Sequence, residues 1–139
     1  FHDGEYLIID EISYRLQEPQ RGEVVVFHYP NNKGTYFIKR IIGLPGERIV
    51  IKEGKIFIFS NNFKDGLVIE EDYLPYRAAT SGESNITLGE NEYFVLGDNR
   101  NFSFDSRNWG PLRDSEIIGL VRLRLWPLNK VMAFEKPAY

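Results

Sequence analysis

One stretch of the sequence, residues 97–107, holds more polar and charged side chains than a surface loop needs. It contains two serines, two aspartates and two arginines, with a glycine at its head. The apolar run directly before it, residues 93–96, is typical of a strand entering a core. Hydroxyls and paired charges beside a buried strand are what a preorganised polar site requires. We therefore treat residues 97–107 as a candidate site and call them the site loop.

A second candidate is Lys39, which lies within an apolar run at residues 37–44. Burial disfavours an ammonium ion, so the pKa of a buried lysine falls below its usual value of about 10.4. A neutral amine can then take the proton of a serine hydroxyl as a general base. The alternative is that Lys39 points to solvent from an amphipathic strand. In either case, strand alternation places Arg40 on the face opposite to Lys39.

Other kinds of catalytic or binding site find little support. The chain has only two histidines, His2 and His28, and no cysteine, which argues against a Ser-His-Asp triad, thiol catalysis and a zinc site. Residues 43–46 lack the Lys-Ser/Thr pair of a phosphate-binding loop. The net charge of −3, with scattered basic residues, gives no reason to expect nucleic acid as a partner. We expect no metal and no cofactor.

The elements that must position these residues are predicted to be strands. Residues 52–55 are typical of a hairpin turn in which a glycine supplies the positive φ. Residues 119–126 alternate between apolar side chains and arginine, and a helical turn is expected only at 113–118. So many strands and so little helix predict an all-β protein built of antiparallel sheets. Other short runs of β-branched and aromatic residues lie at 6–9, 24–27, 37–44, 49–51, 56–59 and 93–96.

The chain length of 139 residues supports one domain, with room for a smaller lobe. Residues 60–90 are polar and rich in turn formers, which indicates an insertion rather than a second core. We therefore predict a β core at 1–52, an inserted cap at 53–90 and the rest of the core at 91–139. No run reaches the 18–20 or so apolar residues that span a bilayer.

Three stretches together resemble the signatures of type I signal peptidases, the membrane-bound serine endopeptidases that remove secretory leader sequences. The site loop reads G-D-N-R-x-x-S-x-D-S-R, like the family's last signature. Residues 21–27 resemble its first β-rich signature, and residues 36–47 contain its lysine motif K-R-x-x-G-x-P-G. Residues 1–5 resemble the segment after its nucleophile motif, S-M-x-P-T. The resemblance covers nearly the whole chain, and residues 53–90 are its least diagnostic part.

The resemblance implies a role for four residues at the site. Lys39 would be the general base, and the Ser103 hydroxyl would orient its amine. Phe37 and Ile38 would line the pockets that accept the small residues of an Ala-x-Ala sequence before the cleaved bond. An extended substrate paired to a strand edge would place alternate side chains in such pockets.

The resemblance implies supporting roles for the rest of the site loop. Asp105 and Arg107 would form an ion pair that braces the loop beneath the site. Gly97 would let the backbone approach the lysine amine closely. Asp98, Asn99 and Arg100 would hold the turn through side-chain to backbone bonds and charge pairing. Without the resemblance, the same cluster could be a polar loop network with no catalytic function.

As a whole, the resemblance implies a serine endopeptidase that cleaves signal peptides from exported preproteins at the membrane surface. Its fold would be the β fold shared by signal peptidases and autoproteolytic repressor domains. The intact enzyme would sit in the plasma membrane through an anchor upstream of the nucleophile, with its catalytic domain on the extracytoplasmic side. It would need neither metal nor nucleotide.

The nucleophile motif would lie immediately before Phe1 and is not within these residues. We therefore expect this chain to be a piece of the enzyme that does not cleave peptides alone. Two alternatives stay open: an autoproteolytic repressor domain, and a noncatalytic β-rich module that binds peptides. A hydrophobic anchor followed by S-M-x-P-T upstream would favour the enzyme, and glycine in place of that serine would favour the binding module.

Overall fold

Two antiparallel sheets make up the fold in the computed structural model, which describes residues 7–10, 18–69, 80–124 and 132–133. The strands of the larger sheet are β1 (Leu7–Asp10), β2 (Val24–Tyr29), β3 (Asn32–Gly43), β8 (Glu92–Leu96), β9 (Leu112–Arg113), β10 (Ile117–Arg124) and β11 (Met132–Ala133). They lie in the order β1-β10-β2-β3-β8-β9, with β11 paired to β10. Helix α2 (Ser106–Trp109) and a 3-10 helix (Asp114–Glu116) lie between β8 and β10.

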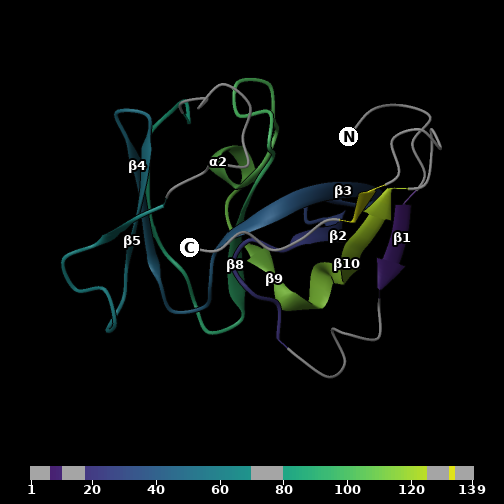
Figure 1. Cartoon of the computed structure of the whole chain (residues 1–139), viewed down its shortest axis with the longest axis horizontal. Helices are drawn as coiled ribbons and strands as arrows, with labels where there is room; N and C mark the ends of the chain where they lie inside the picture. Colours follow the sequence, from purple (N-terminus) through teal and green to yellow (C-terminus); the bar gives the residue numbers. More distant parts are fainter. Residues whose placement is uncertain (1–6, 11–17, 70–79, 125–131, 134–139) are drawn as a thin grey trace.

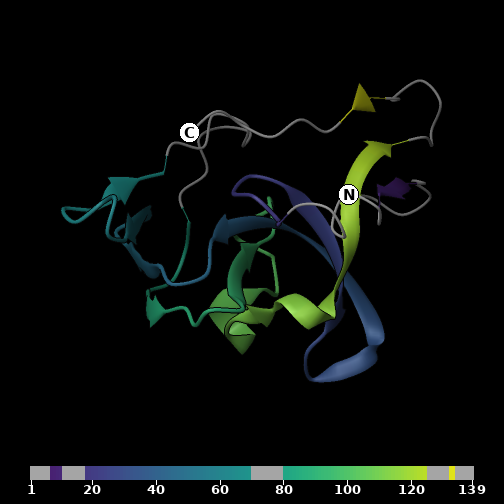
Figure 2. The ribbon, with the colours of Figure 1, turned by 90° about the horizontal axis from the view of Figure 1, so that it is seen from below.

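The smaller sheet is inserted between β3 and β8, which pair with each other in the larger sheet. Its strands are β4 (Arg48–Lys52), β5 (Lys55–Phe59), β6 (Leu67–Val68) and β7 (Ser84–Thr87), in the order β6-β5-β4-β7. Figure 1 shows β4 and β5 at the left and the larger sheet at the right. Strand β3 carries the chain from its hairpin with β2 towards the smaller sheet (Figure 2).

The strands expected from apolar runs are confirmed, with ends that differ by a few residues. The hairpin at 52–55 is also confirmed, and both Glu53 (φ 52°) and Gly54 (φ 77°) adopt the positive φ that a type I′ turn requires. The helical turn expected at 113–118 is the 3-10 helix. Sequence reasoning missed β6, β7, β9 and β11, which have only two to four residues each. His2 and the expected strand residues 125–126 lie outside the described residues.

One apolar cluster joins the two sheets. Ile42, Phe94 and Leu96 of the larger sheet pack in the same cluster as Ile49 and Ile58 of the smaller sheet, all nearly or fully buried. Burying a large apolar side chain stabilises a fold by about 1.5–3 kcal/mol, so this cluster fixes the smaller sheet against β3 and β8. The division at residues 53 and 90 stays a prediction. The smaller sheet itself starts earlier, with β4.

An ion pair joins two of the motif stretches, residues 21–27 and residues 36–47. Arg21 donates from both terminal nitrogens to the carboxylate of Glu47, at 2.7 Å each. Glu47 is the last residue of a turn that begins at Leu44, and its N–H donates to the Leu44 carbonyl. Gly46, the third residue of this turn, has a φ of 81°, as a type II turn requires. The sequence P-G-E at residues 45–47 thus forms the turn that follows the end of β3, and the ion pair of Glu47 fixes the position of this turn. No helix within the described ranges is long and apolar enough to cross a membrane.

Candidate active site

The structure brings together the two residues singled out as base and orienting hydroxyl. Lys39 lies in β3, opposite Val25 of β2, and its Nζ donates to Ser103 Oγ of the site loop at 3.0 Å. The two residues are 64 positions apart in the sequence. The amine also lies 5.4 Å from the centre of the Phe37 ring, which shares its face of the strand. Their roles in a reaction stay predictions.

The surroundings of Lys39 favour its neutral form. Burial lowers the pKa of the amine below its ordinary value, and the positive charge of Arg107 lowers it further. The carboxylates of Asp105 and Asp98 oppose this, but the net direction is downward. A larger share of the amine is therefore unprotonated near neutral pH than for a lysine in water, as a general base requires.

Asp105 holds the site loop together beneath this pair. Its carboxylate is fully buried and accepts the Gly97 N–H at 3.0 Å and the Arg107 guanidinium at 2.9 and 2.8 Å. It also caps α2 by accepting the Arg107 N–H at 3.1 Å. Burial alone would raise the pKa of Asp105, but the bonds from Arg107, Gly97 and Ser103 lower it. Asp105 is thus an anion that fixes both ends of the loop.

Gly97 is needed for the space it leaves. A Cβ at this position would lie 2.6 Å from Ser103 Cβ and 3.3 Å from Lys39 Nζ, and it would overlap the Ser103 hydroxyl. The backbone of Gly97 is not among the glycines with positive φ, so any residue could adopt its conformation. The close approach of the loop to the amine, which the resemblance implied, is therefore possible because glycine has no side chain.

Asp98 ties the site loop to β3. Its carboxylate accepts from Nε and Nη2 of Arg40 at 3.0 and 2.8 Å, a bidentate pair. Arg40 also donates to the carbonyl of Gly22 at 2.9 Å. Since Arg40 follows Lys39 directly, this pair sets the position of the loop relative to the base.

Arg100 and Asn99 stabilise the turn of the loop, and Arg100 reaches beyond it. The buried Arg100 side chain donates from Nε to the Gly97 carbonyl at 2.7 Å and from Nη1 to Thr80 Oγ1 at 2.9 Å. The Asn99 carbonyl accepts the N–H of Phe102 at 3.1 Å. Sequence reasoning missed Thr80, because it lies in a polar stretch without a recognisable pattern.

Phe37 and Ile38, expected to line substrate pockets, lie on opposite faces of the larger sheet. Phe37 packs with the core cluster that includes Val25 and Phe27, whereas Ile38 packs with Val24 and Val26. Side chains alternate along a strand, so consecutive residues cannot share one pocket. The structure does not bring these two side chains together, and their role in binding stays a prediction.

The edge of β3 next to Lys39 is open in the part of the chain that the structure describes. On one side, residues 36–40 of β3 pair with β2. On the other side, the pairing with β8 begins only at Arg40. The backbone of residues 36–39 is therefore available to a further strand from that side, within the described ranges.

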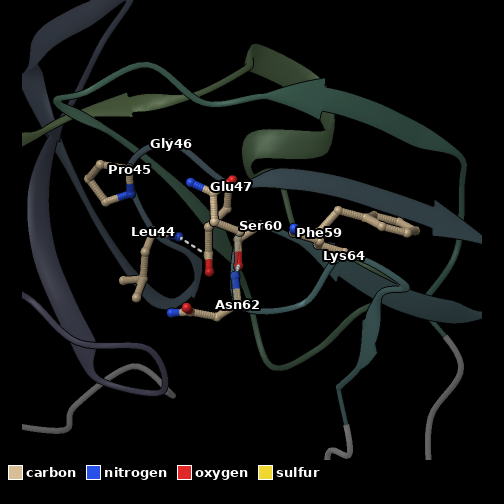
Figure 3. A pocket seen from close by; sticks show the side chains of 9 residues that line it. Leu44, Pro45, Gly46, Glu47, Phe59, Ser60, Asn62 and Lys64 are labelled. Atoms are coloured by element: carbon tan, nitrogen blue, oxygen red, sulfur yellow. Dashed lines mark hydrogen bonds between the residues drawn. The ribbon is translucent and has the colours of Figure 1, made fainter.

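A separate hollow of about 600 Å³ lies between the turn 44–47 and the loop 59–64 (Figure 3). Neither Lys39 nor Ser103 lines it, and its Glu47 carboxylate already accepts from the Leu44 N–H at 2.7 Å. We therefore do not place the reaction there. Among the described residues, no group of three His, Asp or Glu side chains is placed to hold a metal ion.

Comparisons with known proteins agree on one family. The family described as "Signal peptidase, peptidase S26" matches residues 1–126. "Probable signal peptidase I-2" of Synechocystis is 38% identical over 130 residues, which cover 90% of this chain and 56% of that protein. "Signal peptidase I V" of Bacillus subtilis is 33% identical over 87% of this chain and 75% of that protein. The chain therefore spans little more than half the length of the Synechocystis relative.

The fold leads to the same family. The crystal structure of a signal peptidase I from Enterococcus faecalis aligns with a TM-score of 0.63 and 30% identity, over 75% of this chain and 97% of that one. This likeness confirms the predicted fold class, all-β with antiparallel sheets of the signal peptidase kind. The family match spans all three motif stretches, including the loop that meets Lys39. The chain belongs to the signal peptidase family, peptidase S26.

Proposed function

We propose that this chain supplies the general base and its supports for a serine endopeptidase that removes signal peptides from exported preproteins. The observation that carries the proposal is the 3.0 Å contact between Lys39 Nζ and Ser103 Oγ in surroundings that lower the lysine pKa. Family membership supports the same reaction class. In the full-length protein, the nucleophile is a serine of the motif that the resemblance places before Phe1.

In the proposed mechanism, Lys39 first accepts a proton from the nucleophilic serine and then donates it to the leaving amine. The neutral amine takes the proton of the nucleophilic serine while the serine oxygen attacks the scissile carbonyl. The resulting ammonium then gives that proton to the leaving amine as the peptide bond breaks. A water molecule is deprotonated in the same way and hydrolyses the acyl-enzyme. Ser103 keeps the amine pointing at the reacting atoms, and Asp105 holds Ser103.

The substrate is proposed to be an extended segment ending in Ala-x-Ala. The open edge of β3 at residues 36–39 supports this, because it can pair with the backbone of such a segment beside the base. Small side chains at alternate positions would then enter pockets beside β3. The site is proposed to act on the extracytoplasmic side of the plasma membrane, where exported preproteins emerge.

Full-length protein, with the residues upstream of Phe1, is expected to cleave a leader peptide on the carboxyl side of its Ala-x-Ala sequence. Mass spectrometry of the products identifies the cleaved bond. A matched peptide with phenylalanine in place of the last alanine serves as control and is expected to stay intact, because a pocket for a methyl group cannot accept a ring. Absence of cleavage, or equal cleavage of both peptides, would contradict the proposal.

Cleavage is expected to increase with pH through the lowered pKa of Lys39. Below that pKa the amine is protonated and cannot accept the serine proton, so kcat/KM falls as the pH falls. The midpoint should lie below that of an ordinary lysine, which a pH series from about 6 to about 10 would measure. A rate that falls as the pH rises across the acid half of this range is inconsistent with Lys39 as the base.

A further inference from the structure

We propose that Thr80 and Ser81 are positioning residues for the Lys39–Ser103 pair, which they serve by holding the site loop against the hairpin turn between β4 and β5. This proposal rests on the proposed function, since it concerns the same pair. The two residues precede β7, and no sequence motif includes them. We call them the tether.

Thr80 contacts both parts that the tether joins. Its N–H donates to the carbonyl of Gly54, in the turn of the β4–β5 hairpin, at 3.2 Å. Its hydroxyl accepts from Nη1 of Arg100 in the site loop at 2.9 Å. Thr80 is only 2% exposed and Arg100 only 1%, so water does not readily replace this bond. The smaller sheet and the site loop are therefore linked through one buried residue.

Ser81 adds contacts to both arginines of the site loop. Its hydroxyl donates to the carbonyl of Arg100 at 3.3 Å. Its carbonyl accepts from Nη1 of Arg107 at 3.1 Å, and its hydroxyl lies 3.3 Å from the same nitrogen. The tether thus holds one arginine on each side of Ser103.

These two arginines act on the backbone at the floor of the site. Arg100 binds the Gly97 carbonyl at 2.7 Å, and Arg107 binds Asp105, which accepts the Gly97 N–H. Gly97 in turn lies against Ser103 and close to the Lys39 amine. A small shift of Gly97 would therefore change the distance and angle between Ser103 and Lys39. Misplacement of a catalytic group by about 1 Å can lower the rate of the reaction by about 100-fold.

The test is Thr80→Val in the full-length protein, a change that removes the hydroxyl and keeps the shape. We expect kcat to fall by about tenfold with KM unchanged, since one bond to a charged group is lost and substrate contacts are kept. The acid limb of the pH profile should also move to higher pH, because a looser loop lets water reach the Lys39 amine. Thr80→Ser keeps the hydroxyl and should restore both. Thr87→Val, the same change at an exposed position of β7, is the matched control.

Each outcome decides for or against the tether. Equal kinetics for Thr80→Val and Thr87→Val would overturn it, as would a fall in kcat with no shift of the pH profile or no rescue by Thr80→Ser. If Thr80→Val does not fold, Ser81→Ala takes its place, with an expected fall in kcat of about threefold and the same shift in pH.

A second readout separates failure of the tether from failure of the proposed function. NMR titration of the Lys39 ε-carbon in the full-length protein measures the lysine pKa without any cleavage. A higher pKa in Thr80→Val than in the parent supports the tether even if the protein cleaves no leader peptide, an outcome that would refute the proposed function alone. The same pKa in both proteins overturns the tether, whether or not the peptide is cleaved.

Discussion

Replacement of Lys39 by methionine in the full-length protein is expected to lower kcat for leader-peptide cleavage by about 10⁴-fold, the upper end of the range for a general base. Methionine is also unbranched, so the side chain keeps most of its packing beside Phe37 but can no longer accept a proton. Removal of the Lys39 amine also relieves the cost of burying an ammonium ion. The melting temperature should therefore be at least that of the parent, which distinguishes loss of the base from loss of the fold.

Lys64→Met provides the matched control for this variant. Lys64 is exposed and lines the hollow beside the turn 44–47, away from the site loop. The same exchange there should leave kcat unchanged. If Lys39→Met kept kcat within about tenfold of the parent, a different group would be the base and the proposed mechanism would be wrong.

The fold could be predicted from the sequence wherever apolar runs had a clear period. Strands such as β3 and β8 have enough β-branched and aromatic residues to stand out, and the hairpin turn at 52–55 is marked by Gly54. Strands such as β6 and β7 have short, half-exposed patterns, which the composition of a loop can also give. Such strands depend on pairing with β5 and β4, and a local pattern carries no information on pairing.

The site was predictable in its residues more than in its contacts. Periodicity could not place Ser103 beside Lys39, 64 positions away, and the expectation rested on motif resemblance. The pairs between Arg21 and Glu47 and between Arg40 and Asp98 also link distant stretches, and the sequence names the charges without their partners. The opposite faces of Phe37 and Ile38 are a different case. Strand alternation alone predicts that result.

Long-range charge pairs explain why the motif stretches act as one unit. Arg40 follows the proposed base directly and binds the site loop through Asp98, while Arg100 binds the same loop to Thr80. Both arginines are nearly inaccessible to solvent, and Thr80 is buried as well, whereas the Asp98 side chain is 40% exposed, so the Arg100–Thr80 bond is the more shielded of the two. The relative position of the Lys39 amine and the Ser103 hydroxyl therefore depends on several elements, and a change in any of them should act through geometry.

Gly97→Ala is the sharpest test of that geometry, and it is expected to lower kcat by about 100-fold or more. The added methyl group would overlap the Ser103 hydroxyl and lie 3.3 Å from Lys39 Nζ, so Ser103 must move away from the amine. The site loop is held by Asp105 and Arg100 and cannot shift freely. Overpacking of this kind also costs about 1–3 kcal/mol of unfolding free energy, which a denaturant titration would measure.

Gly34→Ala shows whether the effect of Gly97→Ala comes from crowding at the site. Among the described residues, the nearest neighbour of a Cβ at Gly34 would be Asn32 Oδ1, at an ordinary contact distance of 3.5 Å. The same substitution there should change neither kcat nor the unfolding free energy by a measurable amount. Parent-like cleavage by Gly97→Ala would mean that Ser103 can leave the Lys39 amine without consequence. The 3.0 Å contact would then be structural, and the orienting role proposed for Ser103 would be lost, because a hydroxyl that can be displaced at no cost to the rate does not position the base.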